Sequence, residues 1–305
     1  MADAKRQRLA AWVILVVPAF WAINYVVARK APGVIGPYVL ALGRWAMAGA
    51  VLSIMARQEL WAQRDQILRD WRQHLVLGFL GMFICGAWVY EGARSTGAMN
   101  IALIYAAAPV LISLGSVLFL HEHLRLRQML GIALALVGVV HVVVRGEWLA
   151  LAQFQFVVGD LWIVAGTVAW AVYAMLQKYW PSTLSATARL AVTCWGGVVT
   201  LIVPTVWELL FEPAMQPGWQ PWVLMVAAAL GPGVVAYWIY SWAQRSLGAS
   251  RVSVVFYLGP LWGALVAWGI LSEPPGWHHV MGAALILPGV FLATQTSSKP
   301  TELKS

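Results

Sequence analysis

Charged residues are scarce in this chain. Asp, Glu, Lys and Arg make up 10% of its 305 residues, whereas apolar residues make up 61%, and the mean hydropathy is +0.74. Soluble domains carry roughly 25% charged and about 45–50% apolar residues. Because one globular core could not bury so much apolar surface, the composition excludes an ordinary soluble domain and predicts a membrane protein.

Several chemical signatures are also missing. The two cysteines, Cys85 and Cys194, both lie in apolar runs, so they indicate neither a disulfide nor a redox compartment. The sequence has no P-loop and no H-E-x-x-H stretch, and its apolar runs hold no close pair of acids. His121 and His123 would face nearly opposite sides of a helix, which disfavours a metal site. We therefore expect no catalytic residue, no metal and no cofactor.

Apolar runs divide the chain into ten candidate membrane helices, since about 20 apolar residues are needed to cross the hydrocarbon core. The first run, from Leu9 to Val27, is long enough to span and has no cleavage site, so it is interpreted as an uncleaved span. The ten predicted spans are 9–28, 36–56, 74–93, 98–120, 127–145, 157–178, 186–208, 222–243, 249–271 and 277–296.

The distribution of Lys and Arg predicts the orientation of these spans. Only Arg29, Lys30, Arg94 and Arg145 fall on one side, Arg44 lies within a span, and the rest of the 20 basic residues share the side of the N-terminus. The positive-inside rule therefore favours both termini in the cytoplasm. The net charge of +8 reflects this bias and contact with anionic lipid, and we expect no nucleic-acid partner.

The centre of the chain occurs twice, at an offset of 151 residues. Matching positions in 97–139 and 248–290 are Gly97 and Gly248, Ala98 and Ala249, Pro109 and Pro260, Glu122 and Glu273, Gly131 and Gly282, and Gly138 and Gly289. Glycines, a proline and a glutamate kept in register through apolar sequence indicate an internal repeat. Five spans on each side of the loop 145–156 require the second copy to be inverted.

The predicted fold is therefore all-α. It is a polytopic membrane protein with ten transmembrane helices, arranged as two inverted five-helix repeats around a central cavity. The first repeat is placed at 1–147 and the second at 148–305. Inverted repeats typically enclose a substrate site near the midplane and expose it to each side in turn.

Further repeated sequence features indicate a resemblance to a known family. Trp21-Ala22 and Trp170-Ala171 recur in spans one and six, Gly159-Asp160-Leu161 begins span six, and Arg44 lies in span two. With the repeated proline, glutamate and glycines, these features resemble the ten-span, EamA-type branch of the drug/metabolite transporter superfamily. The resemblance implies a basket of ten helices that moves small metabolites, often outward. Its many aromatic residues make the chain similar to bacterial aromatic amino-acid exporters.

Aromatic and polar side chains that share helix faces are the candidate substrate-binding residues. Helical spacing puts Trp21, Asn24 and Tyr25 on one face, and likewise Trp88 with Glu91 and Trp238 with Ser241. Aromatic residues in membrane proteins commonly form interfacial belts, but the deeper, repeated tryptophans would instead give a cavity stackable walls. The predicted substrate-binding set is Trp21, Asn24, Tyr25, Arg44, Trp88, Glu91, Tyr105, Trp170, Tyr173, Trp238, Ser241 and Tyr257.

Ionisable residues inside spans are functional candidates because charges are costly in lipid. Arg44 could hold a substrate carboxylate, or could pair with Glu91 or another acid to fix the helix bundle, and we favour the pairing. Asp160 is expected to cap span six. Span one has no acid of the kind that small four-span drug exporters of the superfamily use for proton coupling, so Glu91 and His141 remain the candidates for such coupling.

The repeated prolines and glutamates each have two interpretations. Pro109 and Pro260 could be packing kinks or paired hinges that gate the two sides. Glu122 and Glu273 are expected to cap helices, with an ionic latch as the alternative.

The leading hypothesis is a secondary transporter of the inner membrane that exports aromatic or other apolar amino acids, or similar small metabolites. An exporter of lipophilic or cationic drugs is the alternative, and an enzyme or a channel is disfavoured. Sugar nucleotides and other phosphate-bearing cargo would require more basic residues within the spans than Arg44. The expected partners are a small-molecule substrate and the lipid bilayer, and we expect a monomer.

Overall fold

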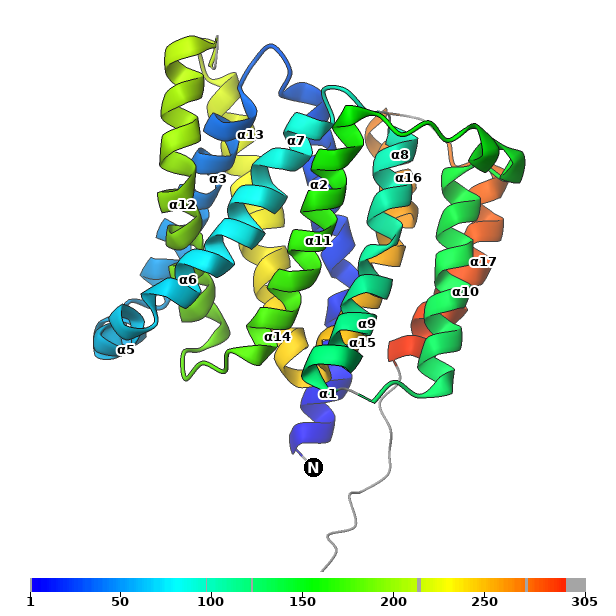
Figure 1. Ribbon diagram of the computed structural model, residues 1–305, viewed down its shortest axis with the longest axis horizontal. Helices are drawn as coiled ribbons and strands as arrows, with labels where there is room; N and C mark the ends of the chain where they lie inside the picture. Colours follow the sequence, from blue (N-terminus) through cyan, green and yellow to red (C-terminus); the bar gives the residue numbers. More distant parts are fainter. Residues whose placement is uncertain (1, 97, 122, 213–214, 272–273, 295–305) are drawn as a thin grey trace, which may run out of the picture.

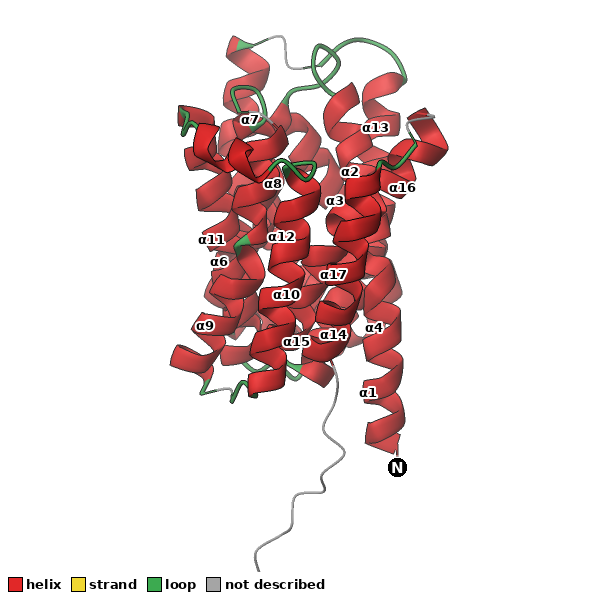
Figure 2. Ribbon diagram, turned by 90° about the vertical axis from the view of Figure 1, so that its right-hand side faces the viewer, coloured by secondary structure: helices red, strands yellow, loops and turns green. Residues whose placement is uncertain are grey.

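The computed structural model describes residues 2–96, 98–121, 123–212, 215–271 and 274–294, and they form a bundle of helices (Figure 1). The bundle is widest across the helix axes (Figure 1), and its loops gather at the two ends (Figure 2). Glu122 and Glu273, whose capping role is predicted above, lie outside the described residues.

Each half of the chain supplies five spans, several of them built from shorter segments. The first half contains α1 (Ala2–Val13), η1 (Ile14–Val16), α2 (Val17–Lys30), α3 (Pro37–Met55), α4 (Arg57–Ala62), α5 (Arg64–Arg69), α6 (Trp71–Gly78), η2 (Phe79–Trp88), α7 (Val89–Gly92), α8 (Ala98–Ala106), α9 (Ala108–Leu120) and α10 (Leu126–Val143). After η3 (Trp148–Gln153), the second half contains α11 (Val158–Tyr179), α12 (Ala186–Phe211), α13 (Gln220–Ala228), η4 (Ala229–Ala236), α14 (Tyr237–Leu247), α15 (Ala249–Ser253), η5 (Val254–Leu258), α16 (Gly259–Leu271) and α17 (Trp277–Thr294).

Ten helices in the described residues are long and apolar enough to cross a membrane, which confirms the predicted spans. Span eight is longer than predicted, since it runs Gln220–Leu247 where 222–243 is predicted. The beginning of α1 and the end of α17 lie at the same end of the bundle, the lower end in Figure 1. We call it the N-terminal face and the opposite end the distal face.

The two halves share the same irregularities at corresponding places. Spans three and eight each contain a π-helical segment, η2 and η4, and both segments include glycines. Spans four and nine are each interrupted before a proline, so that Pro109 lies at the start of α9 and Pro260 at the start of α16. A proline lacks the N–H that would continue the preceding helix. The predicted kinks are therefore present, and their role as gates stays a prediction.

Four glycines of the repeat, Gly131, Gly138, Gly282 and Gly289, meet at the interface between α10 and α17, which run side by side in opposite directions (Figure 1). A Cβ atom placed on Gly131 would lie 2.6 Å from the carbonyl oxygen of Gly289, and one on Gly138 would lie 3.0 Å from that of Gly282. Small residues let helix backbones approach closely in membranes. We call these four residues the glycine contact.

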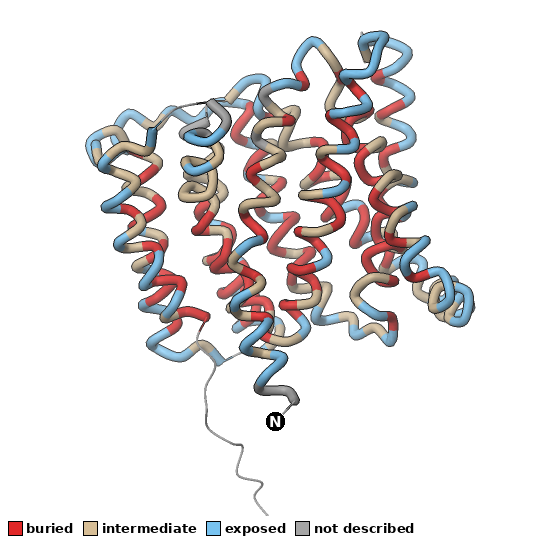
Figure 3. The backbone as a smooth tube through the Cα atoms, turned by 180° about the vertical axis from the view of Figure 1, so that it is seen from behind, coloured by how far each residue is buried: buried red, intermediate tan, exposed pale blue. Residues whose placement is uncertain are grey.

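Buried and exposed positions alternate along most helices, and the loops at the two ends are mainly exposed or half-buried (Figure 3). The largest fully buried side chains include Trp45, Tyr173 and Tyr240. Apolar side chains such as Leu118, Phe119 and Val203 are exposed on the outside. An apolar exterior is expected where lipid surrounds the protein.

The glycine contact predicts a stability effect. Gly131→Ala would place a methyl group against two backbone atoms, the Gly289 oxygen and the Ala293 nitrogen at 2.7 Å. Overpacking of this kind should lower the free energy of unfolding by about 1–3 kcal/mol. The midpoint of thermal unfolding in detergent measures the loss.

Gly263→Ala is the matched control, because a Cβ atom there meets nothing within 4 Å. It should leave the midpoint unchanged or raise it slightly, since alanine has the higher helix propensity. Equal midpoints for the two variants would contradict the close packing of α10 and α17.

Candidate functional site

Six aromatic side chains meet in the middle of the bundle, and we call them the central aromatic cluster: Trp21, Trp170, Tyr173, Tyr237, Tyr240 and Phe256. The ring of Trp21 stacks on Phe256 with centroids 4.8 Å apart and an interplanar angle of 21°. The ring of Trp170 lies 5.3 to 5.8 Å from Trp21, Tyr237 and Phe256. Offset-stacked and edge-to-face pairs at these distances are favourable beyond the area that they bury.

The cluster lies between the two repeats. Trp21 comes from α2 of the first half, and the other five rings come from α11, α14 and η5 of the second half. Trp170 and Tyr173 are three residues apart on α11, as are Tyr237 and Tyr240 on α14, so each pair shares one helix face. Helical spacing therefore brings both pairs toward Trp21.

Segment η2 helps to hold the cluster in place through its backbone. Tyr237 donates a hydrogen bond of 3.2 Å to the carbonyl oxygen of Gly81, and Trp45 donates one of 2.9 Å to that of Met82. Trp45 in turn packs against Tyr237, with centroids 4.9 Å apart. The π-helical segment thus presents carbonyl oxygens to side chains of spans two and eight.

The cluster contains polar atoms with no partner in the described part of the chain. The Trp170 Nε1 and Tyr240 hydroxyl groups are buried close enough to act on each other, but neither makes a well-formed hydrogen bond among the described residues. A buried polar group without a partner costs about 1–3 kcal/mol. Such atoms among stacked rings are suited to a ligand that has both a ring and a hydrogen-bonding group.

Three predicted site residues, Trp21, Trp170 and Tyr173, belong to the cluster, but Trp238 and Tyr257 do not. Trp238 points outward with 38% of its surface exposed, and its Nε1 donates to Thr187 Oγ1 at 2.8 Å. Tyr257 is buried outside the ring contacts. The residues just before them in the sequence, Tyr237 and Phe256, occupy the cluster instead. The predicted positions of Trp238 and Tyr257 in the site are therefore wrong by one residue.

Trp88 belongs to a second aromatic group toward the distal face. Its ring lies 5.0 Å from Trp162 and 5.7 Å from Phe83. Asn24, another predicted substrate-binding residue, accepts a 3.3 Å hydrogen bond from Tyr90.

Of the other predicted site residues, Tyr105 is half-buried opposite Gly166 of α11. Ser241 is buried toward the N-terminal face. The side chain of Tyr25 lies outside the described part of the structure.

Arg44 is a buried cation in the middle of span two. It is 3% exposed, its guanidinium carbon lies 4.3 Å from the ring centre of Trp45, and its Nε has no hydrogen-bond partner among the described residues. The predicted pairing with Glu91 is wrong, because Glu91 instead forms a 3.2 Å ion pair with Arg94, only three residues further along the chain. The spacing of i and i+3 makes that local pair the easier one to form.

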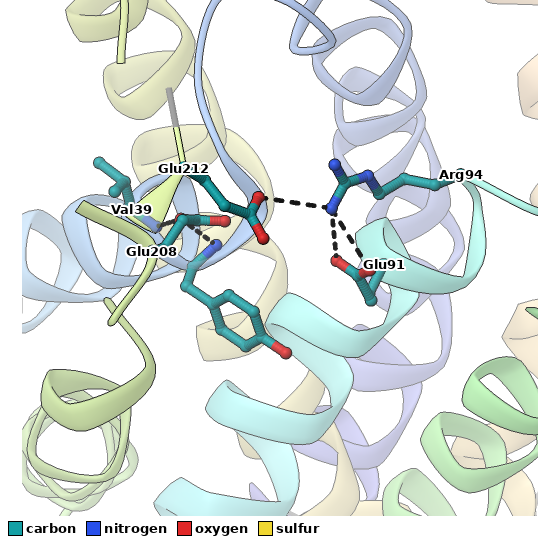
Figure 4. Close-up of polar contacts among 6 residues, drawn as sticks. Val39, Glu91, Arg94, Glu208 and Glu212 are labelled. Atoms are coloured by element: carbon teal, nitrogen blue, oxygen red, sulfur yellow. Dashed lines mark hydrogen bonds and ion pairs between the residues drawn. The ribbon is translucent and has the colours of Figure 1, made fainter. Parts of the chain in front are cut away.

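Acidic residues gather at the distal face, where α7 approaches the end of α12 (Figure 4). Arg94 lies between Glu91 and Glu212, with its NH1 atom 3.8 Å from Glu212. The hydrogen bond with Glu91 raises the pKa of Arg94 above its usual value, so Arg94 stays charged. These side chains are partly exposed, and exposed ion pairs contribute little to stability.

Glu208 is the buried member of this group and was not singled out from the sequence. It is 2% exposed, and its Oε2 accepts hydrogen bonds from the backbone N–H groups of Tyr38 at 3.0 Å and Val39 at 2.8 Å (Figure 4). Those N–H groups belong to the first turn of α3 and have no acceptor within the helix. Glu208 therefore caps α3 from span seven.

Asp160 caps span six, as predicted. Its carboxylate accepts from the backbone N–H of Val157 at 2.8 Å and from the side chains of Thr96 and Asn100. His141 packs beside Trp148 near the distal end of α10, away from the cluster. Among the described residues, no group of three or more His, Cys, Asp or Glu side chains could hold a metal ion.

Two cavities are defined by the described side chains. A groove of about 870 Å³ lies between α1, α16 and α17 and is lined mainly by apolar residues such as Leu258, Trp262 and Leu287. A smaller cavity of about 320 Å³ is lined by polar and basic residues of α11, α12 and α14.

The cap that Glu208 forms on α3 predicts different losses of stability for substitutions at two nearby glutamates. Glu208→Ala leaves two buried N–H groups without an acceptor, so it should lower the free energy of unfolding by about 2 kcal/mol. Glu212→Ala removes an exposed carboxylate four residues away and should change it by less than about 0.5 kcal/mol. Thermal unfolding in detergent compares the two, and an equal loss would argue against the capping role.

Comparison with known proteins identifies the family. The sequence model of the EamA-like transporter family matches twice, over residues 8–144 and 157–295. A solved structure superimposes with a TM-score of 0.75 at 20% identity and covers 94% of this chain and 96% of its own. That likeness supports the ten-helix fold.

Curated relatives match over most of their length. The uncharacterized transporter YyaM of Bacillus subtilis is 26% identical over 90% of each chain. A probable terminal-alkyne amino-acid exporter of Streptantibioticus cattleyicolor is 28% identical over 93% of this chain and 92% of its own. The aromatic amino acid exporter YddG of Ancylobacter novellus is 24% identical over 88% of this chain and 91% of its own. Because the family model matches both halves of the chain, the protein belongs to the EamA-like transporter family of the drug/metabolite transporter superfamily.

Proposed function

We propose that this transporter exports amino acids with aromatic or other apolar side chains, or similar small metabolites, by alternating access. The observation that carries the proposal is the central aromatic cluster, which is assembled from both repeats. Stacked rings with unpartnered polar atoms provide an apolar wall and hydrogen-bonding tips. A site shared by two inverted repeats is also where alternating access requires it.

The charge inside the bundle also supports an amino-acid substrate. Arg44 is buried and forms no ion pair with a described acid, so it gives the interior a positive charge that favours substrates with an anionic group. The two buried acids of the described residues, Asp160 and Glu208, accept backbone hydrogen bonds at helix ends. A lipophilic cation would meet an arginine near the cluster, and we therefore favour amino acids over cationic drugs.

Relatives give independent support, since two of them are named as amino-acid exporters. We retain 1–147 and 148–305 as the two repeats. We also place both termini in the cytoplasm and the chain in the inner membrane of the cell, on the basis of the Lys and Arg distribution.

Substitutions of tryptophan test the position of the site. Trp170→Ala removes a ring that contacts Trp21, Tyr173, Tyr237, Tyr240 and Phe256. Counterflow of radiolabelled phenylalanine into proteoliposomes should fall at least roughly tenfold, because stacking and shape are both lost.

Trp238→Ala is the matched control, since it removes an equally large ring from the outer surface of the adjacent helix α14. It should retain most of the uptake. Normal uptake by Trp170→Ala would remove the cluster from the substrate path. Uptake of a cationic dye with no response to any amino acid would favour the drug exporter.

Alternating access predicts how a cysteine in the cluster reacts. Trp21→Cys is introduced after both native cysteines, Cys85 and Cys194, are replaced by alanine. A membrane-impermeant thiol reagent should label it at a rate that differs between the two faces, and saturating substrate should move the two rates in opposite directions. Rapid labelling from both faces, unchanged by substrate, would instead indicate a channel.

A further inference from the structure

The cavity of about 320 Å³ lies at the N-terminal face, where α11 ends and α12 begins (Figure 1). It is lined by Gln177, Lys178, Ser182, Arg189, Gln244 and Arg245, together with smaller residues. Three of these side chains are cationic and none is acidic. A concave site with convergent polar groups is a candidate for ligand binding.

Arg189 supplies an unused donor to this cavity. It is 4% exposed, and its NH1 and NH2 groups donate hydrogen bonds of 2.7 Å to the carbonyl oxygens of Gln177 and Trp180 at the end of α11. Its Nε has no partner among the described residues. The guanidinium is thereby held rigidly by the helix end while one N–H group remains unpaired.

Gln244 supplies an unused acceptor. It is 5% exposed, and its Nε2 donates to the carbonyl oxygen of Ala174. Its Oε1 is buried without a partner in the described part of the chain. The bond to Ala174 fixes the amide so that Oε1 cannot exchange places with Nε2 without losing that bond.

The nearby acids Glu59 and Asp70 act on Arg245 and Arg189 but do not line the cavity. Glu59 accepts from the backbone N–H of Ser185 at 2.5 Å and from its hydroxyl at 2.6 Å, so it is engaged at the start of α12. Arg245 donates to the carbonyl oxygen of Leu184 at 2.7 Å and stays exposed at the rim. The cavity therefore combines a net positive charge with one buried acceptor.

The cavity adjoins the central aromatic cluster. Gln177 lines the cavity, and its Nε2 donates a 2.6 Å hydrogen bond to the Tyr173 hydroxyl of the cluster. Ser241, another lining residue, directly follows Tyr240. The cavity and the cluster are therefore neighbours, which suits a molecule with a charged head and an aromatic side chain.

We propose that this cavity binds the zwitterionic α-amino-carboxylate head of the transported amino acid at the N-terminal face. The carboxylate accepts from Arg189 Nε and Arg245, and the ammonium donates to Gln244 Oε1. This assignment rests on the proposed amino-acid transport and adds the head-group chemistry that selects the substrate. A lipid phosphate shares the anionic chemistry but has no need of the Gln244 acceptor.

Competition in the phenylalanine counterflow assay tests the assignment. Unlabelled phenylalanine is compared with 3-phenylpropionate, which lacks the ammonium, and with phenethylamine, which lacks the carboxylate. The wild-type protein should prefer phenylalanine to each analogue by about tenfold or more, because each loss leaves a buried polar group unpaired.

Substitutions in the cavity test the ammonium contact and the carboxylate contact separately. Gln244→Met should abolish the preference over 3-phenylpropionate, and Arg245→Gln should weaken the preference over phenethylamine. Arg69→Gln, which removes an exposed cation from α5 on the same face, should alter neither. Equal competition by all three compounds, or variants that keep the wild-type preferences, would overturn the assignment while leaving amino-acid transport intact.

Two further outcomes distinguish a failure of the proposed transport function from a lipid-phosphate site in the cavity. Failure of the wild-type protein to transport any amino acid would remove the proposed function itself. Counterflow in vesicles with and without phosphatidylglycerol tests whether a lipid phosphate occupies the cavity. If Arg245→Gln changes only the dependence of uptake on that lipid and leaves the competitor preferences untouched, the cavity is a lipid-phosphate site. The head-group assignment is then wrong.

Discussion

The absence of water from the membrane core governs the polar interactions of this fold, because each buried polar group must find its partner within the protein. The buried ionisable side chains follow that constraint by binding helix ends. Asp160 binds the start of α11, Arg189 binds the end of the same helix, and Glu208 binds the start of α3 from a different span. Arg44 and His74 are exceptions among the described residues: the Arg44 guanidinium lies against a tryptophan with its Nε unpaired, and neither ring nitrogen of His74 has a partner. Arg44, which lies in the middle of its span, therefore marks the interior as a binding region.

Much of the architecture follows from the sequence because it depends on local and periodic features. Apolar runs determine the ten spans, and glycines in register identify two helices that later prove to touch each other. Helical spacing likewise places Trp170 and Tyr173 on one face. The role of Asp160 also follows from its position in the first turn of a helix.

The site was harder to predict because it depends on geometry that periodicity does not reveal. Segments η4 and η5 depart from α-helical geometry just before Trp238 and at Tyr257. The π-helical turn of η4 holds an extra residue, and the 3-10 turn of η5 winds more tightly than an α-helix, so each changes which side chains face the interior. For that reason Tyr237 and Phe256 face the cluster where their neighbours are predicted. The sequence does not identify Glu208 as a capping residue, because the N–H groups that it binds lie about 170 residues away in the chain.

The glycine contact has a mechanical consequence. It joins the two repeats at one edge of the bundle, where backbones touch and side chains cannot slide between them, while α3 and α12 lie toward the opposite edge (Figure 1). A second joint of this kind lies between α6 and α12, where a Cβ atom on Gly78 would meet the backbone of Gly197. The proposed rocking motion must therefore preserve close contacts at both edges of the bundle, so the change of access falls to the interrupted helices between them, such as α8 with α9 and η5 with α16.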